Sequence, residues 1–150
     1  MSYAPYPPNA QGFTEILIDY KSNFPGQVTS KINGFAAEAF ENLIQGDAVF
    51  SRDSDGKLGK AIANDTQDKA RVVGFVETTA TAGSIVRCIV EGITPVTGLE
   101  SGKKYFLSAN SAGSIVKDPP INSGHFVTRV GQAATNASLI VKTEPPIELA

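Results

Sequence analysis

Short β-rich runs that end at turn-forming residues are the feature that most limits how this sequence can fold. In the C-terminal half these runs cover residues 104–108, 114–117, 126–131 and 138–141, and each is bounded by Gly, Pro, Asn or Ser. Runs of this length and spacing are typical of a small β-sandwich or β-barrel. The sequence therefore predicts a mainly β fold.

The same kind of unit occurs twice in the chain. Residues 46–51 (GDAVFS) resemble residues 102–108 (GKKYFLS), and each is followed by a Gly-containing turn, a short return strand and a strand that carries Val-Gly. The internal repeat covers approximately residues 46–77 and 102–134. A unit this small cannot bury its own apolar face, so two of them are expected to close on each other. The Val-Gly pairs would mark bulges or close approaches of the backbone.

One helix is predicted, over residues 35–44. Its apolar residues recur at helical spacing, with Asn33 as the N-cap and Gly46 as the stop. We expect the apolar side of this helix to pack on the protein's own core, although packing on a partner would leave the same pattern. The hairpin predicted at residues 84–95 closes at its Gly-Ile-Thr-Pro end.

The N-terminal residues 1–12 are rich in proline and are expected to be extended. They are either an unattached terminus or an arm that docks on a neighbouring subunit. Residues 13–20 alternate as a strand does, and the turn at residues 24–27 follows. We therefore divide the chain into an extended arm, 1–12, and a single β-rich domain, 13–150.

Composition excludes several classes of function. Apolar residues make up 41% of the 150 residues, which is too many for a disordered chain, and the net charge is −2 with no basic stripe to bind nucleic acid. No apolar run is long enough to span a membrane, and no signal peptide is recognisable. We expect a protein that is made in the cytoplasm, is soluble, and binds neither nucleic acid nor membrane.

The residue types that usually carry chemistry do not form a recognisable motif. His125 is the single histidine, and Cys88 lies among strand residues and is expected to behave as a small hydrophobic side chain. The run Asp53 to Gly56 begins like a calcium loop, but Asn64 stands where the acidic ligand is needed, so we favour a hairpin turn. We expect no catalytic residue, no metal and no cofactor, and hence no enzyme.

With these residues in view, the chain resembles the capsid decoration (cement) proteins of tailed bacteriophages. The resemblance depends on residues 24–27 (FPGQ), the amphipathic stretch that leads into 46–50 (GDAVF), the strand at 72–76 and the hairpin at 83–92. The C-terminal half, 99–149, is also similar to small β domains of phage tail fibres and capsid spikes.

This resemblance implies a β-barrel or β-tulip subunit, often a homotrimer, on the outside of the capsid. Such a subunit binds the major capsid protein over threefold positions and ties neighbouring capsomers together. The residues that we expect at the interface with the capsid or a neighbouring subunit are Tyr3, Tyr6, Phe13, Phe24 and Pro25.

Two other functions remain open at this point. A host-adhesion module of a tail fibre or spike would need exposed aromatic side chains at loop tips, whereas Tyr105, Phe106 and Phe126 lie within predicted strands. A small β-barrel enzyme would need a pocket that gathers acids such as Asp65 and Asp68, and the spacing does not support one.

Overall fold

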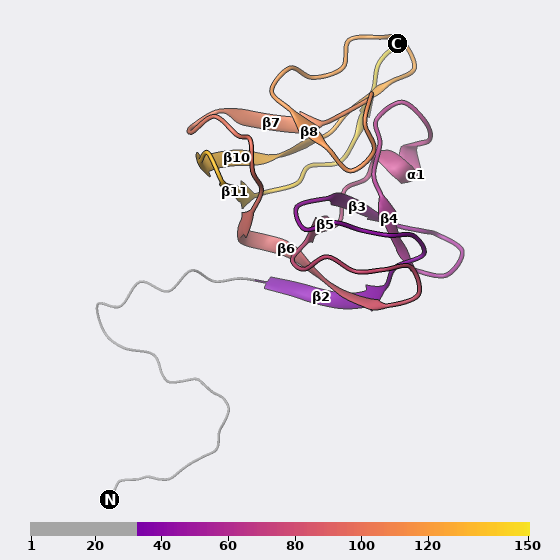
Figure 1. Cartoon of the computed structure of the whole chain (residues 1–150). Helices are drawn as coiled ribbons and strands as arrows, with labels where there is room; N and C mark the ends of the chain where they lie inside the picture. Colours follow the sequence, from indigo (N-terminus) through magenta and orange to yellow (C-terminus); the bar gives the residue numbers. More distant parts are fainter. Residues whose placement is uncertain (1–32) are drawn as a thin grey trace, which may run out of the picture. The chain divides into compact units, whose positions relative to one another are not determined.

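The computed structural model describes residues 33–150, and almost all of its regular structure is β (Figure 1). The predicted arm, the predicted strand 13–20 and the turn 24–27 lie outside the described residues. The elements, in chain order, are β2 (Asn33–Glu38), β3 (Ala48–Ser51), β4 (Leu58–Lys60), α1 (Gln67–Ala70), β5 (Gly74–Val76), β6 (Ile85–Pro95), β7 (Lys104–Leu107), β8 (Ile115–Val116), β9 (Phe126–Val127), β10 (Arg129–Thr135), β11 (Ser138–Val141) and β12 (Ile147–Glu148). The predicted mainly β, barrel-like fold is confirmed.

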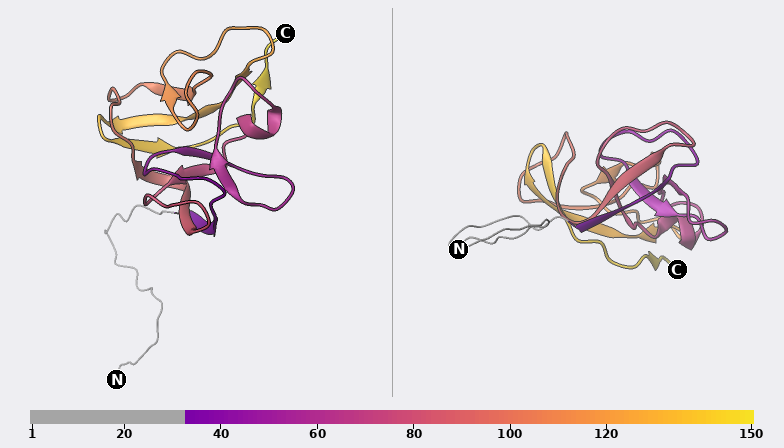
Figure 2. Two further views of the ribbon diagram at one scale, coloured as in Figure 1. Left: turned by 45° about the vertical axis from the view of Figure 1, so that its right-hand side comes forward. Right: turned by 90° about the horizontal axis from the view of Figure 1, so that it is seen from below.

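Nine of these strands form one strongly curled sheet (Figure 2). Its order is β4-β3-β5-β6-β11-β10-β7-β8, with β2 paired to β6 as well. In the first half β3 lies between β4 and β5, and β5 pairs with β6. In the second half β7 lies between β8 and β10, and β10 pairs with β11. The two halves thus have the same pairing scheme, and the β6–β11 pair joins them. The internal repeat of residues 46–77 and 102–134 stays a prediction.

The first half closes into a small barrel. β2 pairs antiparallel with β6, and a parallel bridge joins Ala39 to Leu58, where the Phe40 N–H donates to the Leu58 carbonyl at 3.0 Å. The strands β4, β3, β5, β6 and β2 therefore lead back to β4. The barrel encloses a cluster of buried residues: Ala39, Leu43, Val49, Leu58, Val76, Val86 and Cys88.

A second, larger core lies on the other face of the same strands. Because side chains alternate along a strand, Val49 points into the barrel while Ala48 and Phe50 point into this second core. Its members come from both halves of the sheet, for example Phe75 from β5 and Leu139 from β11. Strands β3 and β5 are therefore buried on both faces, as in the interior of a larger sheet.

Backbone hydrogen bonds also join the halves away from the β6–β11 pair. The Ala63 N–H donates to the Ser108 carbonyl at 3.0 Å, and the Phe126 N–H donates to the Ala63 carbonyl at 2.8 Å. Gly113 accepts from Ala48 and donates to Ala61, both at 2.8 Å. These bonds satisfy the backbone groups of loops that would otherwise be buried without partners.

The prediction of a helix over residues 35–44 is wrong. The first part of this stretch is strand β2, and the rest makes isolated bridges, Ala39 to Leu58 and Leu43 to Ala80. The predicted N-cap, Asn33, instead donates its side-chain amide to Glu91 at 2.9 Å. The pairing of β2 with β6 satisfies the backbone, and tertiary pairing of this kind outweighs a weak local helix propensity.

The predicted end of a hairpin at residues 92–95 is also wrong, because β6 continues through these residues and pairs with β11. Gly92 has φ +115°, a conformation that glycine adopts without strain. Two further glycines permit close packing, as the Val-Gly pairs predicted. A Cβ at Gly74 would overlap the Cys88 sulfur, and one at Gly131 would overlap the Ile140 carbonyl.

Thr94, opposite Leu139 in the β6–β11 pair, provides a test of this packing. Its side chain is buried, and its hydroxyl has no hydrogen-bond partner within residues 33–150. A buried unpaired hydroxyl is costly, so we expect Thr94→Val to raise the free energy of unfolding by about 1 kcal/mol in urea denaturation.

Thr128 is the matched control, because its buried hydroxyl donates to the Ala70 carbonyl at 2.7 Å. Thr128→Val should lower the free energy of unfolding by roughly 1–3 kcal/mol, since it leaves that carbonyl unpaired. If both substitutions destabilise equally, the Thr94 hydroxyl has a partner and the packing described at this position is incorrect.

Candidate interaction surface

The first half of β2 presents a strand edge. Among the described residues this strand forms a ladder only with β6, and its residues 33–36 are exposed. The Ala39 N–H donates to the Ser84 carbonyl at 2.9 Å, which fixes the alternation of the ladder. Phe35 and Ala37 therefore direct their backbone groups toward β6, whereas Gly34 and Ala36 direct theirs outward. An edge of this kind can accept a strand from another chain.

The outer face of the β6–β11 pair carries two apolar side chains next to each other. Ile93 and Ile140 are directly opposite in the register, and 42% and 44% of their surfaces are exposed. Cross-strand pairing continues from Ile140 to Gln132 and from Gln132 to Lys104, and both of these residues are exposed as well. We call these four residues the outer-sheet row. It offers an apolar pair at one end and polar groups at the other.

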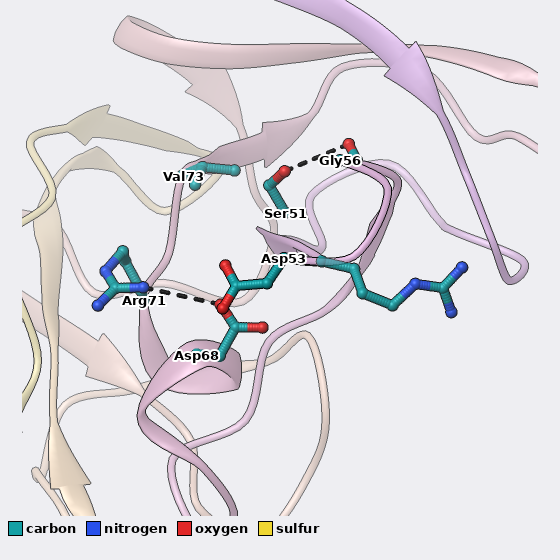
Figure 3. Close-up of a pocket in the computed structure, with 7 residues that line it drawn as sticks. Ser51, Asp53, Gly56, Asp68, Arg71 and Val73 are labelled. Atoms are coloured by element: carbon teal, nitrogen blue, oxygen red, sulfur yellow. Dashed lines mark hydrogen bonds and ion pairs between the residues drawn. The ribbon is translucent and has the colours of Figure 1, made fainter.

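A charged groove lies between the β3–β4 hairpin tip and α1 (Figure 3). Its cavity volume is about 310 Å³, and the carboxylates of Asp53 and Asp68 extend into it from the two sides. Arg71 pairs with Asp68 at 3.7 Å. The groove therefore contains charges of both signs.

Helix α1, which positions Asp68 in the groove, was not predicted from the sequence. The one sequence signal for this helix was its N-cap residue Thr66, whose hydroxyl accepts from the Lys69 N–H at 3.3 Å.

The turn predicted at Asp53 to Gly56 forms the hairpin tip, and an ion pair between Arg52 and Asp55 stabilises it. The Arg52 guanidinium pairs with the Asp55 carboxylate at 2.6 Å, and the Lys57 N–H donates to the same carboxylate at 3.1 Å. Because these donors stabilise the charged form, the pKa of Asp55 falls to about 2. Arg52 also lies over the ring of Phe40, 4.1 Å from its centroid.

Two titratable groups, one partly buried and one fully buried, lie away from these surfaces. Burial raises the pKa of Asp47, even though the Ile44 N–H donates to its carboxylate at 2.9 Å. Burial also raises the pKa of the Cys88 thiol to about 12, so the thiol stays protonated at neutral pH. Cys88 is a core residue, as predicted.

The residues that the sequence singled out for chemistry stay apart. His125 lines a separate cavity of about 200 Å³ beside residues 118–122, and its backbone carbonyl accepts from the Leu149 N–H at 2.8 Å. Within residues 33–150, His, Cys, Asp and Glu side chains do not gather in threes at metal-binding distance. The one helix of this part of the chain is a single turn, far short of the thickness of a bilayer.

The predicted interface residues Tyr3, Tyr6, Phe13, Phe24 and Pro25 lie outside the described residues. The surfaces identified above were not found from the sequence, because they depend on which strands become neighbours. Comparison with protein-family models and with curated protein sequences gives no match.

Cys88 gives a direct test of burial in the barrel. A thiol whose pKa is about 12 is hardly ionised at pH 8, and its sulfur is enclosed. Iodoacetamide at pH 8 should leave the native protein unmodified and should alkylate it fully in urea, as mass spectrometry can show. Alkylation of the native protein at the rate of a free thiol would contradict the placement of Cys88.

Asp55 gives a pH test of the hairpin tip. Because its pKa is about 2 in the folded protein and ordinarily 3.8, its contribution to stability is present above about pH 4 and is lost as the pH falls through 2. Asp55→Asn should therefore be less stable than the wild type at pH 5, and the difference should shrink toward pH 2. Asp53→Asn is the control, since Asp53 makes no ion pair within residues 33–150. A difference that is independent of pH would contradict the Arg52–Asp55 pair.

Proposed function

We propose that this protein is a structural protein of a phage virion, a decoration protein that binds the outer surface of the capsid. The observation that carries the proposal is the exposed pair Ile93 and Ile140 on the outer face of the sheet. Apolar side chains that lie side by side on the exposed face of a hydrogen-bonded strand pair are suited to contact with another protein. The identity of the partner, a major capsid protein, comes from the sequence resemblance.

The packing of the domain supports a function in which surface contacts with other proteins matter. The interiors of both cores are filled by apolar side chains, and two ion pairs, Arg52 with Asp55 and Arg71 with Asp68, lie at the surface. A body of this kind can contribute contacts to a shell without changing shape. Each contact can be weak, because many copies bind a lattice whose geometry is already fixed.

The edge of β2 supplies a second means of contact. The outward backbone groups of Gly34 and Ala36 can pair with an extended segment of a neighbouring subunit. We propose that subunits also contact each other on the capsid exterior, as homotrimers. The protein would be made in the host cytoplasm and would reach the capsid after the shell has formed.

The proposal predicts that the protein makes capsids more resistant to heat and to low salt. Particles assembled with and without it should be heated in parallel, and release of DNA should be followed with an intercalating dye. Particles that lack the protein should release DNA at a lower temperature, because fewer contacts hold neighbouring capsomers together. Equal resistance of the two preparations would contradict the proposal.

A variant in the outer-sheet row sharpens this experiment. Ile140→Lys should weaken attachment to bare capsids by about tenfold, because a charge replaces an apolar contact. Ile121→Lys is the matched control, since Ile121 is 87% exposed but lies in a loop outside the row. If both variants attach as the wild type does, the outer-sheet row is not the contact surface.

A further inference from the structure

A second cavity lies next to the charged groove. Its volume is about 480 Å³, within the range of cavities that hold a ligand, and it shares Arg52 and Asp68 with the groove. It is framed by the segment that follows β2, by β3, by the end of β4, by the segment around α1 and by the loop that contains Ala112. Five separate parts of the chain thus build one site, which we call the β4–α1 cavity.

The floor of the β4–α1 cavity is apolar and firmly held. It is formed by Phe40, Phe50 and Ile62. The rings of Phe40 and Phe50 meet edge to face with their centroids 5.9 Å apart. Gly59 lets the Phe40 ring lie directly on the backbone of β4, because a Cβ there would overlap the ring. The Arg52 guanidinium, 4.1 Å from the centroid of the Phe40 ring, covers part of this floor, so Ile62 and the Arg52–Phe40 stack form the surface that an apolar group would meet.

The rim of the cavity has one ammonium group that makes no ion pair within the described residues. Lys69 pairs with Asp65 at 2.9 Å, and Arg52 is held by Asp55. Lys60 also lines the cavity, and its ammonium group makes no ion pair with any residue in 33–150. Glu41 lines the cavity as well, and its carboxylate accepts from the Lys60 backbone N–H at 2.8 Å, which holds it against the backbone of β4.

We infer that the β4–α1 cavity is a second docking point, which receives an apolar side chain flanked by a carboxylate on the partner protein. The apolar side chain would lie against Ile62 beside the Arg52–Phe40 stack, and the carboxylate would pair with the Lys60 ammonium. A charge-assisted contact beside a filled apolar pocket is a common arrangement for a residue that anchors an interface. This inference rests on the proposed function, because the partner is taken to be a protein.

The position of the cavity fits a protein that ties two neighbours together. Figure 1 shows α1 and β4 at the right of the domain and β10 and β11 at its left. The β4–α1 cavity and the outer-sheet row therefore lie on different sides of one rigid body. One subunit could contact two capsomers at once through these two surfaces.

N-acetyl-phenylalanine, a carboxylate with one aromatic ring, is a probe that tests the cavity without the partner. Titrated into the full-length ¹⁵N-labelled protein, it should shift the amide resonances of Thr66, Lys69 and Ala112. N-acetyl-phenylalanine amide, which has the same ring without the charge, should bind about tenfold more weakly. Lys60→Met, which keeps the aliphatic stem, should weaken binding of the acid by the same factor.

Lys142→Met is the matched control, because Lys142 is exposed just after β11, outside both the cavity and the outer-sheet row, and should leave binding of the probe unchanged. Equal binding of the acid and the amide to the wild type would overturn the inference, and this comparison needs no variant. Shifts confined to other residues would also overturn it. Binding of the probe without attachment to capsids would support the cavity as a binding site and contradict only the proposed function. Attachment to capsids without binding of the probe would contradict the cavity as a binding site and leave the proposed function supported.

Discussion

The antiparallel pairing of β6 with β11 is the interaction on which the rest of the structure depends. The first part of the long strand β6 pairs with β2 and β5 and completes the small barrel, and its last four residues pair with β11. The second core takes residues from both halves of the sheet. Without the β6–β11 pair, each half would expose one face of that core to water, at a cost proportional to the apolar area. The two halves are therefore stable mainly as one body.

Burial on both faces of β3 and β5 decides where function can reside. The side chains of these strands are used for packing, as the alternation of Val49 with Ala48 and Phe50 shows. Groups that can meet a partner are left at the strand edge of β2, on the outer-sheet row and around the hairpin tip. The proposed contacts therefore lie on surfaces that the core holds in position, with the β4–α1 cavity and the outer-sheet row on different sides of that core.

The sequence predicted those parts of the fold that depend on local chemistry. The Asp-Gly turn at residues 55–56, the short strands at β3 and β7, and the burial of Cys88 follow from residue types and alternation alone. Residues 35–44 were predicted wrongly because alanine and phenylalanine at helical spacing also suit a strand once β6 lies beside them. The extension of β6 past Gly92 was missed for a related reason, since its partner β11 is more than 40 residues away in sequence. The β4–α1 cavity could not be predicted, because its floor and rim come from five segments that only the closed sheet brings together.

Native-state hydrogen exchange is the measurement that tests the central claim most directly. If β6 and β11 join the halves into one cooperative body, the slowest amides in β3, β5, β10 and β11 should exchange with the same free energy of opening, equal to that of global unfolding. They should also respond equally to added denaturant. Exchange from β10 and β11 at a clearly lower free energy than from β3 and β5 would show that the halves open separately, and it would contradict the account.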